Sequence, residues 1–234
     1  MAGDKSTRSG RVGVHFALRI PHSAFPTSMS QKNNTLLIVL SAPSGGGKTT
    51  LCEQMLRDNP NMSRAVTCTT RAPREGERDG VDYYFLAAED FLKRVQAGNF
   101  LEHATVYGNS YGTLKSEVLG KLRAGKDVLL AVDVQGAAAI RAQAEGDPEL
   151  ARALVQVFLT PESLAVLEQR LRKRGKDAPD AIKKRLAVAK QEIAQWKHFD
   201  YLLISTSVRE DVRRMQAIYD AEQMRRARST APEI

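Results

Sequence analysis

From residue 35 onward, short aliphatic runs alternate with longer segments in which apolar positions recur at helical spacing. The runs predict buried strands at 36–40, 128–132, 154–159 and 200–204. Helices are predicted at 48–57, 88–97, 115–124 and 179–194, after Gln135, and from Val208 onward. Strands separated by helices are typical of a doubly wound α/β fold with a parallel sheet. In such a fold, ligands bind at the carboxyl ends of the strands.

One block of the chain interrupts this alternation. A second strand is expected at 65–68, and residues 69–112 then contain turn-forming residues such as Pro73 and Gly80. Short strands are expected there, around the helix at 88–97. The block therefore predicts a subdomain inserted into the α/β core.

Local capping signals predict where the helix after the third long strand begins and ends. Thr160, Pro161 and Glu162 match the N-cap, N1 and N2 residues of a helix. Gly175 is placed to end it, because glycine readily adopts the left-handed conformation at a helix terminus.

A glycine-rich loop closely follows the first strand. Its residues are Ala42, Pro43, Ser44, Gly45, Gly46, Gly47, Lys48 and Thr49, with Thr50 next. The glycines let backbone N–H groups surround phosphate oxygens, Lys48 adds positive charge, and the Thr49 hydroxyl is placed to bind Mg²⁺. A plain glycine-rich turn is the alternative, which the preceding aliphatic strand disfavours. The pattern predicts a P-loop that binds a nucleotide polyphosphate with Mg²⁺.

Asp133 ends the strand at 128–132. P-loop proteins place an acidic residue at this position to hold Mg²⁺. The alternative is that Asp133 caps the helix that follows it.

A second anion site is predicted within the inserted block. Arg71 and Arg74 lie three residues apart beside several threonines, and Tyr83 and Tyr111 belong to the same block. Arginine forks and hydroxyl groups together bind phosphate well. The alternative is a solvated charged loop.

Charge and composition narrow the function further. The net charge is +8, and residues 1–34 carry half of that excess, with five basic residues against one aspartate. No DNA- or RNA-reading motif accompanies the basic residues. No stretch approaches the roughly 18–20 apolar residues that span a membrane, and the two cysteines have no metal or disulfide spacing. We expect a cytoplasmic protein with neither nucleic-acid nor membrane partners.

Residues 1–34 have little apolar periodicity and almost no acidic residues. A flexible basic tail, or sequence upstream of a true start at Met29, is the favoured interpretation. An organellar transit peptide is the alternative, because it shares this composition.

Several separated motifs resemble the guanylate kinase (GMP kinase) family, bacterial type, from Thr35 to about Arg228. They are A-P-S-G-G-G-K-T, T-C-T-T-R-A-P-R-E-G-E with D-Y-Y-F, F-L-E-H-A-T-V-Y-G-N-S-Y-G-T, V-D-V-Q-G, and R-L-R-K-R-G with K-K-R-L. The resemblance implies a guanylate-kinase-like domain over 35–229. Its parts would be a core (35–66, 115–160 and 195–229), a GMP-binding subdomain (67–114) and a helical lid (161–194).

The same resemblance implies roles for individual residues. Those holding the GMP phosphate would be Arg71, Arg74, Tyr83, Tyr111 and Thr67. Those reading the guanine and its surroundings would be Glu102, Thr113 and Asp133. The lid arginines would be Arg174 and Arg185 at the transferring phosphoryl group, with Arg170 as a further contact to ATP. Chemistry agrees for Glu102, because an ionised carboxylate accepts from the adjacent N1–H and N2–H₂ donors of guanine.

Three positions depart from the family pattern. Ala42 replaces the first P-loop glycine, and Ala131 stands where many members carry a second aspartate. Ser205, Thr206 and Ser207 replace an Asn-Asp pair, which affects how adenine is recognised.

The implied activity is transfer of the γ-phosphoryl group of ATP to GMP or dGMP. One alternative is a related kinase for a sugar phosphate, which the Glu102–Thr113 pair disfavours. The other is a non-catalytic guanylate-kinase-like module, which is disfavoured by the presence of Lys48, Thr49, Arg174 and Arg185. The oligomeric state, a monomer or a small homo-oligomer, is left open.

We expect a chain starting at Met29 to keep the melting temperature and the kinetics of the full chain. The reason is that residues 1–34 lack the apolar periodicity of a packed element. Thermal unfolding and steady-state assays of both chains test this. A melting temperature several degrees lower in the shorter chain would show that the tail packs on the domain.

Overall fold

The structure is a computed structural model that describes residues 35–106, 108–173, 175, 178–226 and 228. The basic tail predicted at 1–34 lies outside the described residues. Within the described part of the chain, no helix has both the length and the apolar character needed to cross a bilayer.

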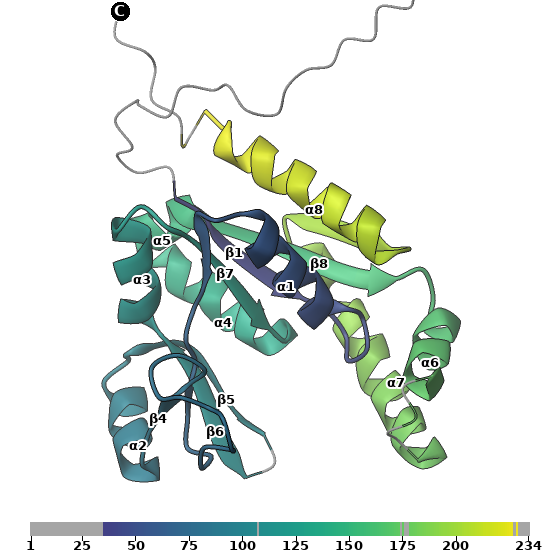
Figure 1. Cartoon of the computed structure of the whole chain (residues 1–234), viewed down its shortest axis with the longest axis horizontal. Helices are drawn as coiled ribbons and strands as arrows, with labels where there is room; N and C mark the ends of the chain where they lie inside the picture. Colours follow the sequence, from purple (N-terminus) through teal and green to yellow (C-terminus); the bar gives the residue numbers. More distant parts are fainter. Residues whose placement is uncertain (1–34, 107, 174, 176–177, 227, 229–234) are drawn as a thin grey trace, which may run out of the picture. The chain divides into compact units, whose positions relative to one another are not determined.

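A five-stranded parallel sheet forms the centre of the fold (Figure 1). In spatial order its strands are β2 (Met62–Arg64), β7 (Asp127–Val132), β1 (Leu37–Ser41), β8 (Leu154–Pro161) and β9 (Tyr201–Ser205). β1 pairs with β7 on one side and with β8 on the other, so the strand order changes direction at β1. A ligand crevice is expected at the carboxyl end of such a strand. The predicted parallel α/β fold is confirmed.

Side-chain alternation along β1 divides the core into two layers. Ile38 and Leu40 pack toward one set of helices, whereas Leu37 and Val39 pack toward the other. The helices are α1 (Lys48–Asp58) and α8 (Val208–Gln223) on one face, and α3 (Lys115–Arg123), α4 (Val134–Glu145) and α5 (Pro148–Ala153) on the other (Figure 1). Each fully buried aliphatic side chain of this kind contributes about 1.5–3 kcal/mol, so β1 is stabilised from both sides.

The inserted block forms a second sheet. Its order is β4 (Tyr84–Phe85), β3 (Cys68–Thr69), β6 (Asn109–Leu114) and β5 (Phe100–Val106), with the β5–β6 pair antiparallel. Helix α2 (Ala88–Gln96) packs on this sheet through Phe91, whose ring stacks on that of Phe100 at 4.5 Å between centroids. This sheet therefore has an apolar cluster of its own.

Two helices between β8 and β9 pack against each other. They are α6 (Leu164–Lys173) and α7 (Pro179–Ile193), and the short 3₁₀ helix η1 (Trp196–His198) follows them. Leu167 and Leu171 of α6 meet Ile182 and Ala189 of α7 in a small buried cluster. This cluster holds the helix pair together as a unit.

Two element predictions were wrong. The strand expected at 65–68 lies mostly in the connection between two strands, because β2 ends at Arg64 in the parallel sheet and β3 begins at Cys68 in the second sheet. The chain changes sheets between them.

The helix expected from Thr160 begins later. Thr160 and Pro161 still belong to β8, where Pro161 pairs with Ser205. Ser163 takes the capping position, since its hydroxyl oxygen accepts the N–H of Val166 at 3.2 Å. A proline at the end of a strand and one at helix position N1 give the same sequence signal.

A buried carboxylate ties the start of the sheet to the last helix. Asp127 at the start of β7 accepts the N–H of Leu36 at 2.8 Å. It also accepts the hydroxyl of Tyr219 and, at 3.0 Å, the amide of Gln223, both from α8. Burial raises the pKa of Tyr219, and its hydrogen bond to Asp127 acts in the same direction. The neutral phenol therefore serves as a donor to a buried charge.

We expect Tyr219→Phe to lower the free energy of unfolding by about 1.5–3 kcal/mol, because it removes a hydrogen bond to a buried charged group. Urea unfolding measures the loss. Tyr84→Phe is the matched control, since the Tyr84 hydroxyl is half-buried and donates to Glu117 over a longer 3.3 Å. Equal losses in both variants would contradict a special role for Asp127.

Candidate active site

The glycine-rich loop lies at the carboxyl end of β1, where the strand order changes direction. Gly45 and Gly47 have φ angles of 90° and 101°, which only glycine adopts without strain. The loop surrounds a cavity of about 360 Å³, which we call the P-loop cavity. Its lining residues are Ala42, Pro43, Ser44, Gly45, Gly46, Gly47, Lys48, Thr49, Thr50, Asp133 and Glu192. The eight residues predicted as a P-loop are therefore assembled around one cavity.

The loop also packs closely against α6. A Cβ atom added at Gly45 would lie 2.9 Å from Leu171 and 3.2 Å from Leu167. Glycine at this position therefore serves two needs, a positive φ angle and close approach to α6.

Lys48 begins α1 and points back toward the sheet. Its ammonium group donates to the carbonyl oxygen of Val132 at 2.7 Å. Burial holds the pKa of Lys48 below its ordinary value, and the nearby Asp133 carboxylate acts in the opposite direction. The side chain is thus held at the edge where β1 and β7 end.

Asp133 caps α4. Its Oδ1 atom accepts the N–H of Gly136 at 2.8 Å, so the capping alternative describes part of what this residue does. Its side chain also lines the P-loop cavity beside Thr49, and Oδ2 is not used by the cap. Capping therefore leaves one carboxylate oxygen for a second task.

Helix α7 contacts the tip of the P-loop at Ser44. Arg185 donates to the Ser44 hydroxyl at 3.5 Å, and Glu192 of the same helix lines the P-loop cavity with Ser44. Burial raises the pKa of Glu192, and its Oε2 atom is buried with no hydrogen-bond partner among the described residues. Sequence reasoning found Arg185 and missed Glu192. The two lie seven residues apart on one face of a helix, a spacing that could have identified both.

Glu102 and Thr113 meet across the β5–β6 pair. They stand opposite each other in register, and the Thr113 hydroxyl donates to Glu102 Oε1 at 2.7 Å. Burial raises the pKa of Glu102, which the Thr113 hydrogen bond opposes. The predicted pair is therefore in contact, with the second carboxylate oxygen left for a ligand.

The predicted phosphate cage is partly assembled. The Arg71 guanidinium lies over the Tyr83 ring at 5.4 Å, and the Tyr83 and Tyr111 rings are 6.3 Å apart. Glu77 holds Arg71 through two hydrogen bonds of 2.9 Å, and it accepts the backbone N–H of Arg74 at 2.8 Å. Sequence reasoning missed this carboxylate, although it belongs to the quoted motif and follows Arg71 by six residues.

Thr67 lies between the two sheets. It lines a small cavity of about 140 Å³ that it shares with Thr49 and Cys52. The structure thus places Thr67 next to the helix that carries the P-loop lysine.

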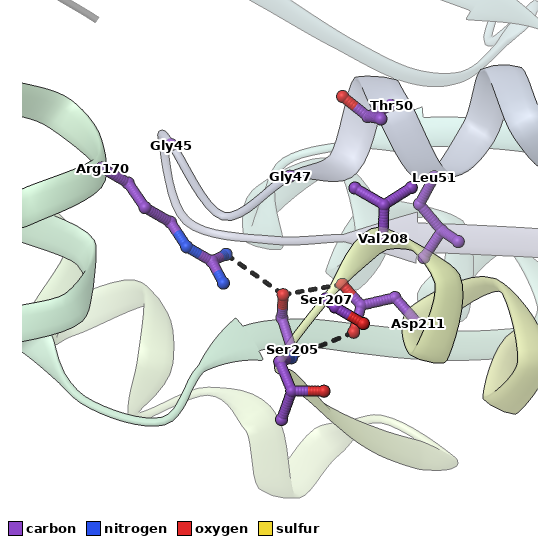
Figure 2. A pocket seen from close by; sticks show the side chains of 10 residues that line it. Gly45, Gly47, Thr50, Leu51, Arg170, Ser205, Ser207, Val208 and Asp211 are labelled. Atoms are coloured by element: carbon purple, nitrogen blue, oxygen red, sulfur yellow. Dashed lines mark hydrogen bonds between the residues drawn. The ribbon is translucent and has the colours of Figure 1, made fainter. Parts of the chain in front are cut away.

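Another cavity, of about 340 Å³, adjoins the P-loop on the side of β9 (Figure 2). We call it the donor-side pocket, and it is lined by Gly45, Gly47, Thr50, Leu51, Arg170, Ser205, Thr206, Ser207, Val208 and Asp211. Arg170 extends from α6 and donates to the Ser205 hydroxyl at 3.1 Å. Sequence reasoning found Arg170 but missed Asp211. Arg174, the other predicted lid arginine, lies outside the described residues.

Comparisons with known proteins agree with this arrangement. The sequence model of the family described as guanylate kinase matches residues 34–222. The guanylate kinase of Maricaulis maris is 42% identical over 193 residues, covering 82% of this chain and 86% of that protein. The guanylate kinase of Paramagnetospirillum magneticum is 41% identical, with 82% and 87% covered.

A solved structure supports the same relationship. The crystal structure of guanylate kinase from Anaplasma phagocytophilum has a TM-score of 0.64 and 32% identity, covering 84% of this chain and 90% of that one. The family match, the curated relatives and this structural neighbour all point the same way. The chain belongs to the guanylate kinase family.

Proposed function

We propose that this protein transfers the γ-phosphoryl group of ATP to GMP, and also to dGMP. The products are ADP and GDP or dGDP. The single observation that carries the choice of GMP is the Glu102–Thr113 pair, which occurs in the same molecule as a P-loop. Family membership supports the same activity.

The carboxylate at Glu102 suits guanine and no other common purine. Guanine presents N1–H and N2–H₂ as adjacent donors, and an ionised carboxylate is a pair of acceptors. Thr113 uses one lone pair of Oε1 and thereby fixes the orientation of the group. Adenine presents an acceptor at N1, which would face the carboxylate unfavourably.

The acceptor phosphate would lie in the cage of Arg71, Arg74, Tyr83 and Tyr111. Glu77 orients the Arg71 guanidinium before any ligand binds, which lowers the entropy lost on binding. We propose that the second sheet, within residues 67–114, is the GMP-binding subdomain. The α6–α7 pair, within 161–194, would be the lid over the donor.

Phosphoryl transfer needs the two nucleotides in line and positive charge around the transferred group. Lys48 would approach from the core and Arg185 from α7, with Arg174 as the second lid arginine predicted from the sequence. Arg185 already reaches Ser44 at the tip of the P-loop. Closure of the lid over both substrates would exclude water and so suppress hydrolysis of ATP.

Thr49 and Asp133 fit a magnesium site in which the phosphate oxygens of a nucleotide supply further ligands to the ion. Both line the P-loop cavity, and Mg²⁺ in such sites takes one or two protein oxygens together with phosphate oxygens. When bound, the ion would supply positive charge to the β- and γ-phosphates. A cytoplasmic location fits this chemistry, since the substrates are free nucleotides.

An assay of ADP release tests the function directly. We expect turnover with GMP and dGMP, and little with AMP or sugar phosphates. Turnover with a sugar phosphate but not with GMP would favour the related-kinase alternative. No turnover with any acceptor would favour a non-catalytic module.

We expect Lys48→Ala to lower kcat by a factor on the order of 10² or more while the fold stays intact, because it removes a cation from the transferring phosphates. Circular dichroism checks the fold. Lys126→Ala is the control, since Lys126 is exposed and precedes β7 outside the site. A near-normal kcat in Lys48→Ala would contradict the assignment of the P-loop.

We expect Glu102→Gln to lower kcat/KM for GMP by about 30- to 1000-fold, since one acceptor oxygen becomes a donor that faces a donor. IMP lacks the 2-amino group, so its rate, already poor, should fall by less. The affinity for ATP should be unchanged, because the P-loop cavity is separate.

Glu89→Gln is the matched control for this substitution. Glu89 is exposed on α2, the helix that packs on the sheet containing Glu102. Its replacement should therefore leave kcat/KM for GMP unchanged. Equal losses for GMP and IMP in Glu102→Gln would show that Glu102 does not contact the 2-amino group.

A further inference from the structure

A chain of two hydrogen bonds links helix α6 to the start of helix α8 (Figure 2). Arg170 of α6 donates to the Ser205 hydroxyl oxygen at 3.1 Å. Ser205, at the end of β9, gives its own hydroxyl proton to Oδ2 of Asp211 at 2.7 Å. A guanidinium has only donors and an ionised carboxylate has only acceptors. The chain therefore has one direction, from Arg170 through Ser205 to Asp211.

The two inner members of this chain are buried and held in place. Ser205 is 3% exposed and Asp211 is 6% exposed. Oδ1 of Asp211 also accepts the backbone N–H of Thr206 at 3.1 Å, which fixes the carboxylate. A hydroxyl that gives its proton to a carboxylate is polarised, and it becomes a stronger acceptor for the next donor. The charge of Asp211 therefore strengthens the hydrogen bond at Arg170, although a neutral hydroxyl stands between the two ions.

A second arginine of α6 shows what a direct ion pair does. Arg172 pairs with the Glu168 carboxylate of the same helix at 2.6 Å. A carboxylate in direct contact neutralises the cation and competes with any other anion that approaches it. Arg170 meets a hydroxyl instead, which takes one of the five N–H donors of its guanidinium. Arg170 is thus held in place while its positive charge stays open to a ligand.

Arg170 is held at the edge of the P-loop. The next residue, Leu171, lies so close to the loop that a Cβ atom added at Gly45 would be 2.9 Å from its side chain. Arg170 lines the donor-side pocket together with Gly45 and Gly47 of the loop. Packing therefore fixes the backbone of α6 beside the P-loop, and Ser205 fixes the far end of the Arg170 side chain.

An arginine side chain has many rotamers, and a partner that restricts it before the ligand arrives lowers the entropy lost on binding. We propose that Ser205 and Asp211 are positioning residues, which hold the Arg170 guanidinium at the P-loop so that it meets the phosphates of the phosphoryl donor. This inference rests on the proposed function, under which the P-loop binds those phosphates. Both residues act through Arg170 and need no contact with the transferred group.

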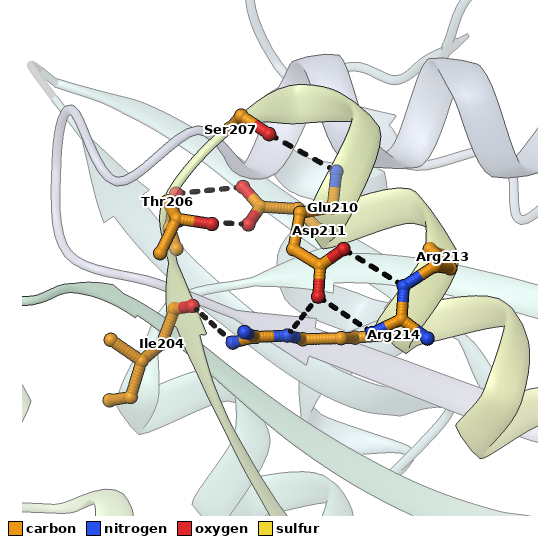
Figure 3. A network of polar contacts seen from close by, with 8 residues as sticks. Ile204, Thr206, Ser207, Glu210, Asp211, Arg213 and Arg214 are labelled. Atoms are coloured by element: carbon orange, nitrogen blue, oxygen red, sulfur yellow. Dashed lines mark hydrogen bonds and ion pairs between the residues drawn. The ribbon is translucent and has the colours of Figure 1, made fainter.

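A second network in the same segment offers a control (Figure 3). Glu210, next to Asp211 on α8, pairs with Arg213 and Arg214. Arg214 also donates to the carbonyl oxygen of Ile204 at 3.0 Å. This network fastens the end of β9 to α8, but its three charged side chains are not among those that line the donor-side pocket. A general loosening of the segment would therefore appear in a Glu210 variant as well.

A double-mutant cycle between Asp211 and Arg170 tests the proposal. At saturating GMP, we expect Asp211→Asn to lower kcat/KM for ATP by about 10-fold, because it removes the charge that strengthens the Arg170 hydrogen bond. In an Arg170→Ala background, the same substitution should change kcat/KM for ATP by less than about 2-fold, since no guanidinium is left to position. Ser205→Ala breaks the chain at its middle and should give the same pattern, so the test does not depend on one variant.

Glu210→Gln is the matched control, because it removes ion pairs from the same segment without touching Ser205 or Arg170. It should leave kcat/KM for ATP within about 2-fold of the wild-type value, since partly exposed ion pairs contribute little. Losses from Asp211→Asn and Ser205→Ala that are equal with and without Arg170 would show a merely structural role and overturn the proposal. A loss in Glu210→Gln as large as that in Asp211→Asn would overturn it too.

Binding of mant-ATP, a fluorescent form of ATP, needs no acceptor and separates this inference from the proposed function. We expect Asp211→Asn and Ser205→Ala to weaken mant-ATP binding in the wild-type background and to have no further effect once Arg170 is replaced. That pattern without turnover of any acceptor would overturn only the proposed function. Turnover of GMP with mant-ATP binding that neither substitution changes would overturn only the inference.

Discussion

Two phosphate groups that repel each other must come within bonding distance in this reaction, and the arrangement of positive charge follows from that requirement. Two unit charges 4 Å apart interact by about 4 kcal/mol near a protein surface. Under the proposed function, cations would be supplied from three parts of the fold. Lys48 would come from the first residue of α1, Arg71 from the loop after β3 of the second sheet, and Arg170 and Arg185 from the α6–α7 pair. No single element could surround both phosphates.

A carboxylate holds one of these cations in place before substrates arrive. Glu77 accepts two hydrogen bonds from Arg71, and Glu192 lines the P-loop cavity together with Lys48. Burial lowers the pKa of Lys48, so its charge is costly to keep and interacts strongly with an anion that neutralises it. Preorganised charge of this kind needs little rearrangement when the substrates bind.

The sequence predicted what depends on local pattern and missed what depends on contacts between distant segments. The aliphatic run of β1 and the glycines after it determine a strand and a loop within about a dozen residues, and both were predicted correctly. The strand expected at 65–68 was wrong because the true strands lie on either side of residues 65–67, at 62–64 and 68–69. Only their pairing partners decide that the two belong to different sheets. Glu192 was missed because it lines the P-loop cavity, whose other lining residues are remote from it in the chain.

The carboxylates of Glu102 and Asp211 both lie in poorly solvated surroundings, but their hydrogen-bond partners differ. A buried carboxylate is expensive to keep ionised, as the raised pKa of Glu102 shows, and that cost is justified where it rejects the wrong base. On the donor side, Asp211 is buried too, but Ser205 and Thr206 take up its charge. Its hydrogen bonds therefore stabilise the loop of residues 205–207. Glu102 gives one oxygen to Thr113, and under the proposed function the other would accept from the guanine.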